Sequence, residues 1–322
     1  LAMAALPAVW MLPVVIFALR FCGQGMSSHI GTVAMARWFV AARGRALAIA
    51  ALGFAFGEAF LPLIFVWALT FAQWQSLWVV AAGLVLLILP LVVRLLRGER
   101  TPQSAASDGG SVGMGGRHWT RPQVLRHWLF WVMVPAVLGP SAFGTAFFFQ
   151  QVHLAEVKGW AHLELVALFP VYTGVGILAM LGSGWLIDRF GTTWLMSLSQ
   201  LPVALAFIIL AGADSLSLAA LAIGLMALTF GAGATLPGAF WAEFFGTRHL
   251  GSIKALATAI MVLGSAIGPW VTGAMIDRGF DFPDQMIWIG IWFVAVFCLV
   301  ALGMAQARKA LPSAAEVDVV RS

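Results

Sequence analysis

Long apolar stretches alternate with short polar loops along almost the whole chain. One partial and nine full stretches are long enough to cross a bilayer. They cover 1–9, 13–36, 46–69, 77–97, 128–150, 164–187, 193–212, 216–242, 255–275 and 286–307. A membrane helix needs about 20 apolar residues, whereas strands of a membrane barrel alternate over about ten. The pattern therefore predicts an all-α polytopic membrane protein.

Residues 98–126 interrupt this pattern, because Ser, Gly and Pro are dense there and apolar residues are sparse. Such a composition is typical of flexible linkers. We therefore expect a first helical bundle over 1–97, a flexible linker over 98–126, a second bundle over 127–309 and a tail over 310–322. Since the chain starts inside an apolar stretch, we expect the first bundle to be incomplete.

The composition excludes most other classes of protein. Of the 322 residues, 61% are hydrophobic and only 10% are charged, against about 25% charged in soluble domains. The two cysteines, Cys22 and Cys298, lie in apolar stretches and predict neither a disulfide framework nor a metal site. We expect no metal, no cofactor and no nucleic-acid partner, and a monomer whose partner is the lipid bilayer.

Basic residues are distributed unequally between the two sets of loops. Fifteen of the 18 Lys and Arg lie in or beside the linker, at the C-terminal end and in the loops of the same side. The opposite loops hold only Lys158 and Arg278, and Arg20 lies within a span. By the positive-inside rule the linker and the C-terminus should be cytoplasmic. We expect an integral protein of a plasma membrane, such as the bacterial inner membrane.

The two halves repeat a glycine pattern that suggests an internal duplication. Gly53 and Gly57 in one span recur as Gly264 and Gly268 in another, where Pro269 follows. Glycines four apart let membrane helices approach closely, which predicts packing roles for these residues. Internal repeats of this kind are typical of transporters.

A loop motif points to a known family. The segment 184–191 reads Gly-Trp-Leu-Ile-Asp-Arg-Phe-Gly at the end of a span. It resembles the G-x-L-x-D-R-x-G signature of the major facilitator superfamily, in which it joins the eighth and ninth of twelve helices. The resemblance implies two six-helix bundles, the first incomplete here, and a gating role for Gly184, Asp188, Arg189 and Gly191. Thr192 and Thr193 stand where basic residues are usual, so we expect a weaker charge network.

A finer resemblance concerns the segment from Arg20 to Gly25, with basic residues following at 37–45. It is similar to the fourth helix and next loop of the monocarboxylate and oxalate/formate branch, partly shared with nitrate carriers. This implies alternating-access transport of a small organic anion, proton-coupled or by exchange. A drug or metabolite efflux antiporter is the alternative, although Glu58 replaces the proline of that group's fifth-helix motif. A membrane enzyme is less favoured, because no H-E-x-x-H motif is present.

Five polar residues are candidates for the solute and proton site. Arg20 and Glu58 are the basic and the acidic residue deepest in the predicted spans, and at nearly equal depth we expect them to pair. Arg20 could instead clamp helices structurally. Gln150, Tyr172 and Thr173 lie in the outer halves of the spans after the linker and could donate hydrogen bonds to a solute. Gln150 could also be an interfacial residue.

Overall fold

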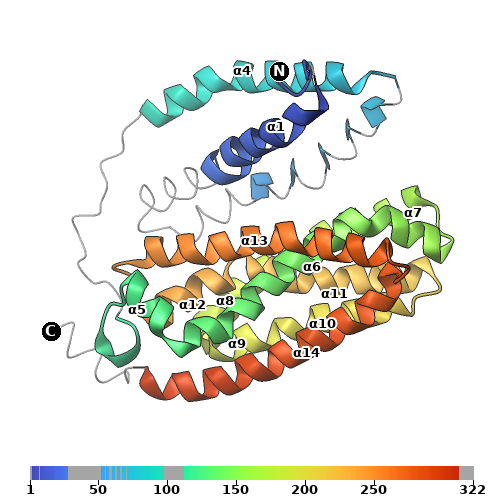
Figure 1. The fold of residues 1–322 in the computed structure, drawn as a ribbon. Coiled ribbons are helices and arrows are strands. Elements are labelled where there is room, and N and C mark those ends of the chain that lie inside the picture. The colour runs from blue at the N-terminus through green and yellow to red at the C-terminus, as the bar shows by residue number, and fades with distance from the viewer. Residues whose placement is uncertain are drawn as a thin grey trace. The chain divides into compact units, whose positions relative to one another are not determined.

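The computed structural model describes residues 2–6, 8–27, 52–54, 56–57, 60–61, 64–65, 67–69, 71–97 and 112–311. The contacts divide the chain into two units, Leu1–Asp108 and Gly109–Ser322, which we treat separately. The described parts are helical and contain no strand (Figure 1). The prediction of an all-α membrane fold is therefore confirmed.

The first unit contains α1 (Leu12–Leu19), which continues into a π-helical segment (Arg20–Ser27), and α4 (Trp74–Arg97). Pro13 lies in the first turn of α1, where a missing N–H costs no helical hydrogen bond. The apolar side chains of α4 are largely exposed around the helix, as expected where lipid or other helices cover them. Helix α4 matches the predicted span 77–97, while residues 28–36 of the span 13–36 and half of the span 46–69 lie outside the described residues.

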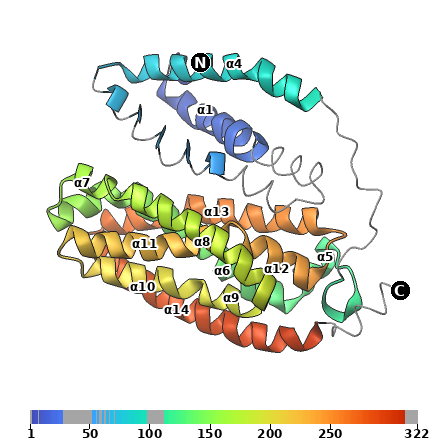
Figure 2. The same ribbon diagram turned by 180° about the vertical axis from the view of Figure 1, so that it is seen from behind.

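The second unit holds six candidate membrane crossings, whose helices lie side by side and alternate in direction (Figures 1 and 2). The helices are α6 (Trp128–Lys158), α7 (His162–Val166), α8 (Phe169–Phe190), α9 (Thr193–Leu198), α10 (Gln200–Ala211), α11 (Leu216–Gly233), α12 (Leu236–Phe245), α13 (Leu250–Ile276) and α14 (Phe282–Ala307). Three crossings combine two helices each, namely α7 with α8, α9 with α10, and α11 with α12. Among the described helices, these six and α4 are long and apolar enough to span a membrane.

Helix boundaries follow the predicted spans within a few residues, except at the end of α6. This helix continues to Lys158 rather than stopping near 150. Gly159 then ends it in the left-handed conformation (φ 68°), with its N–H bonded to the carbonyls of Ala155 and Glu156. We call the end where α6 and α13 begin the linker end of this unit.

Close contacts between helix backbones depend on glycine at three places. An ideal Cβ on Gly268 would overlap the carbonyl of Ala142 in α6, and one on Gly264 would lie 2.8 Å from the Leu138 oxygen. In the same way Gly231 of α11 packs directly on Gly176 of α8. Helix pairs α6–α13 and α8–α11 therefore interlock through small residues, the usual means of packing in a bilayer.

Buried polar groups lie where helices are interrupted. Pro140 leaves the Ala136 carbonyl of α6 without its intrahelical donor, and Nε2 of buried Gln200 lies 3.5 Å from that oxygen. At the α11–α12 break, which precedes Pro237, the Thr235 and Ser183 hydroxyls are 2.8 Å apart. These contacts supply partners for polar groups that lipid cannot satisfy.

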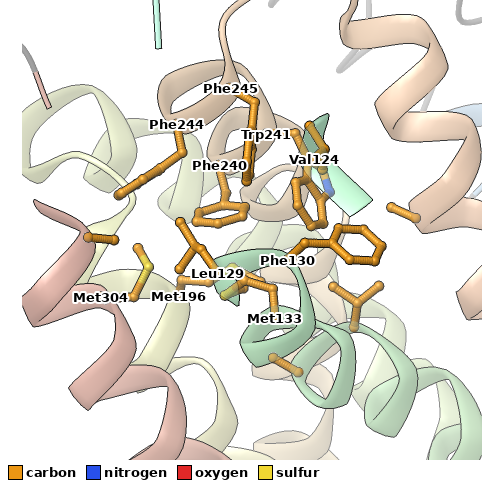
Figure 3. Packing of buried hydrophobic residues seen from close by; sticks show 14 of the residues in the cluster. Val124, Leu129, Phe130, Met133, Met196, Phe240, Trp241, Phe244, Phe245 and Met304 are labelled. Atoms are coloured by element: carbon orange, nitrogen blue, oxygen red, sulfur yellow. The ribbon is translucent and has the colours of Figure 1, made fainter. Parts of the chain in front are cut away.

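Residues 112–126, which the sequence analysis assigned to the flexible linker, are folded onto the second unit. Met114 and Trp119 are buried, and the short helix α5 (Arg121–Arg126) buries Val124 in the same cluster. The cluster also contains Leu129 and a group of aromatic residues from α12 (Figure 3). These apolar anchors explain why this stretch differs from a free linker.

Candidate functional site

The signature loop is built at the linker end of the second unit. Helix α8 ends at Phe190, and Gly191 turns the chain with φ 70°, a region that favours glycine. Thr192 is fully buried and is the N-cap residue of α9. Its N–H and its hydroxyl both donate to Oε2 of Glu243 in α12, at 3.0 and 2.7 Å. A charged acceptor receiving two donors ties the loop firmly to α12.

Sequence reasoning did not identify Glu243, and it treated Thr192 as a loss from the family pattern. In the structure Thr192 supplies both donors of this contact. The sequence signal that could have identified Glu243 is an acidic residue directly after the predicted span 216–242. That span ends on the same side of the membrane as the signature loop. A sequence does not show which span ends next to which loop.

The other signature residues differ in how far the structure describes them. The Arg189 guanidinium lies 5.6 Å from the Trp185 ring and 5.7 Å from the Phe190 ring, so cation–π contacts hold it near its own helix. Gly184 faces open space. Asp188 lies in α8, but its side chain falls outside the described part, and its gating role stays a prediction.

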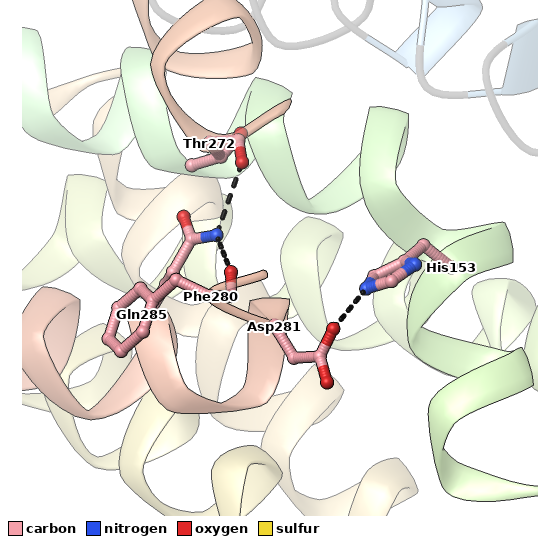
Figure 4. Close-up of polar contacts among 5 residues, drawn as sticks. All are labelled: His153, Thr272, Phe280, Asp281 and Gln285. Carbon is pink, nitrogen blue, oxygen red and sulfur yellow. Dashed lines mark hydrogen bonds and ion pairs between the residues drawn. The ribbon is translucent and has the colours of Figure 1, made fainter. Parts of the chain in front are cut away.

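A polar network joins three helices near the opposite end of the unit, and Figure 4 shows its part around Thr272 and Gln285. The Nε2 amide of Gln150 in α6 lies 3.3 Å from the Pro269 carbonyl and 3.4 Å from the Thr272 hydroxyl. Gln285 of α14 is buried and donates to the carbonyls of Thr272 and Phe280, at 3.1 and 2.7 Å. Gln150 therefore bridges α6 to α13 beside Pro269, and this contact would compete with binding a solute.

Two further contacts lie at the same end. His153 Nε2 of α6 lies 3.3 Å from Oδ1 of Asp281, just before α14 (Figure 4). Lys158 donates from Nζ to the Ala211 carbonyl at the end of α10, at 2.6 Å. Both contacts place the end of α6 beside the ends of its neighbours, consistent with alternating helix directions.

Tyr172 and Thr173 lie near the start of α8 and are partly buried. The Tyr172 ring packs edge-on against Phe148 of α6, with centroids 5.5 Å apart, and lies 6.2 Å from Phe230 of α11. The structure therefore places Tyr172 at a junction of three helices, within an aromatic cluster.

The candidates of the first unit are described only in part. Arg20 follows α1 as its C-cap and is exposed, whereas Glu58 lies outside the described residues, so their pairing stays a prediction. Gly57 faces the Leu61 side chain, and Gly53 has nothing within 4 Å among the described atoms.

Comparison with known proteins identifies the family. A profile described as Major Facilitator Superfamily matches residues 1–192, which is more than half of the chain and includes the signature loop up to Thr192. A search of curated proteins finds no match. The match and the membrane-spanning helices together show an integral membrane protein of transporter type. The chain belongs to the major facilitator superfamily of secondary transporters.

Proposed function

We propose that the protein moves a small organic anion, such as a monocarboxylate, by alternating access. Family membership carries the transport function. A gating role of the signature loop is supported by its attachment to α12 through Glu243. Through this contact, a movement of α12 would be passed to the loop between α8 and α9. In this proposal Asp188 and Arg189 act with that contact when the helical bundles rock about a central site.

The proposed solute class rests on Arg20. A guanidinium offers a planar pair of donors suited to a carboxylate, and Arg20 lies in the helical segment 12–27 with its side chain exposed within the first unit. Glu58 would pair with it and carry the coupled proton, or the anion would exchange against another. Tyr172 and Thr173 would add hydrogen bonds from the second unit.

Ligand-induced stabilisation of the purified full chain in lipid nanodiscs tests the solute class, because a ligand of the folded state raises its apparent stability. The panel contains lactate, formate, oxalate, nitrate, glucose and tetraphenylphosphonium. We expect a carboxylate to raise the unfolding temperature, and Arg20→Gln to abolish the effect. Arg94→Gln is the matched control, since Arg94 is an exposed arginine of α4 with no proposed role.

Stabilisation by tetraphenylphosphonium alone would favour the alternative, a drug or metabolite efflux antiporter. An unchanged response of Arg20→Gln to carboxylates would remove Arg20 from the site. We also propose that the linker and the C-terminus are cytoplasmic, that the membrane is a bacterial inner membrane, and that the protein is a monomer.

A further inference from the structure

Residues 113–127 hold the linker end of α12 by its backbone. The Trp119 N–H donates to the Phe245 carbonyl at 3.0 Å, which is one of the terminal helix carbonyls that have no partner within α12. Gly113 packs so closely on the Phe244 carbonyl that a Cβ would overlap it. The Trp119 indole donates to the Met114 carbonyl at 3.1 Å, which closes the segment on itself. We call residues 113–127 the clasp.

His127 connects the clasp to α6. It is the N-cap of α6, and its Nδ1 accepts from the Leu129 N–H at 3.3 Å. Its ring meets Trp119 edge-on with centroids 4.8 Å apart, and Phe245 with centroids 6.1 Å apart. One imidazole thus caps α6 while it packs on the two residues whose backbones join the clasp to α12.

The cap depends on the protonation state of His127. Only a neutral ring can accept at Nδ1, because both nitrogens of a protonated ring are donors. Protonation would also place a cation near Arg117, whose guanidinium lies 4.0 Å from the centre of the Trp119 ring. Burial, and then the charge of Arg117, lower the pKa of His127 below its ordinary value of 6.5. The closed clasp therefore favours the neutral ring.

The other charged groups nearby differ from Arg117 in position. Arg121 and Arg126 of α5 are exposed, as is Arg248 after α12, and Glu243 of α12 accepts from Thr192. His118 is a second histidine of the clasp, next to Trp119, so any test must control for it.

We propose that residues 113–127 form a pH-sensitive clasp on α12, closed while the His127 ring is neutral and released when it is protonated. Release frees the end of the helix that holds the signature loop through Glu243, so acidity on that side of the membrane acts on the proposed gate. This proposal concerns the release of the end of α12 and does not depend on which solute is carried.

Hydrogen exchange in the full chain in nanodiscs measures the opening directly, through the Trp119 and Leu129 amides. After correction for the intrinsic pH dependence, we expect exchange to accelerate on acidification below about pH 6.5. The increase is about tenfold per pH unit until the lowered pKa of the closed state is reached. His127→Asn should remove the response, because asparagine caps helices without titrating. His118→Gln should respond like the wild type.

Arg117→Met keeps an apolar stem on Trp119 and removes the charge, so the pKa of His127 in the closed state is lowered less. Its acceleration should therefore begin at the same pH as in the wild type but level off at a higher pH. A pH response that persists in His127→Asn, or one that disappears in His118→Gln, overturns the proposal. If His127→Asn does not fold, NMR titration of ¹³C-labelled histidine in the wild type decides. A His127 signal that does not titrate together with the exposure of the Trp119 amide would refute the clasp.

Discussion

At the scale of single residues, the contact between Thr192 and Glu243 determines how the signature loop is held. The N–H and the hydroxyl of Thr192 both donate to Oε2 of Glu243, and Thr192 is completely buried. A buried donor without a partner is costly, whereas an intact hydrogen bond adds only modest net stability. Loss of the carboxylate should therefore affect the protein more than loss of the hydroxyl.

Replacing Glu243 with alanine leaves both Thr192 donors unpaired. We expect a loss of about 1–3 kcal/mol in the free energy of unfolding, measured by reversible unfolding in mixed micelles. Thr192→Val removes one donor together with its need for a partner and should cost less. Glu156→Ala replaces an exposed carboxylate of α6 and should change stability by less than about 0.5 kcal/mol. Equal losses for the Glu243 and Glu156 variants would contradict a structural role of the contact.

At the scale of helices, small residues set where the crossings approach each other. Gly268 lies directly on the Ala142 carbonyl, and a backbone oxygen held in α6 cannot move away as a flexible side chain can. Gly224 of α11 also lies inside a helix, but an added Cβ there meets nothing within 4 Å. The two positions separate the effect of packing from the effect of helix propensity.

Gly268→Ala should push α13 away from α6 and destabilise the protein by about 1–3 kcal/mol, as expected for overpacking. Gly224→Ala should be neutral or slightly stabilising, because alanine favours helix by up to about 1 kcal/mol over glycine. Thermal unfolding of both variants in nanodiscs measures the difference. A Gly268 variant as stable as the Gly224 variant would show that the close approach of α6 and α13 carries no energetic weight.

The crossings could be predicted from sequence because a bilayer requires long apolar stretches, and the end of α6 differed because Gly159, not a change in polarity, stops the helix. The clasp was missed because its polar composition is that of a linker, while Trp119 and Met114 find their partners in a distant segment. Glu243 was missed for the same reason. Local patterns specify helices, but contacts between helix ends depend on the tertiary arrangement.

At the scale of the whole molecule, the uneven distribution of Lys and Arg between the loops predicts an orientation in the membrane. The fold of the second unit is consistent with that orientation. Lys158 lies at the end of α6 beside the end of α10, whereas Arg248 follows α12 and precedes α13 at the linker end. Three crossings lie between these two residues and alternate in direction, so the two residues belong to opposite ends. By the positive-inside rule, we propose that the linker end faces the cytoplasm.

Cysteine labelling in intact cells tests this orientation. In a background with Cys22 and Cys298 replaced by serine, a membrane-impermeant maleimide should label Lys158→Cys from outside. Arg248→Cys should react only after the cells are permeabilised. His162 is exposed at the start of α7, on the other side of the short turn that follows Lys158. His162→Cys should therefore be labelled in the same way, which controls for the loss of the Lys158 hydrogen bond. Labelling of Arg248→Cys in intact cells, without labelling at positions 158 and 162, would show the opposite orientation. The His127 clasp would then be exposed to external rather than cytoplasmic pH.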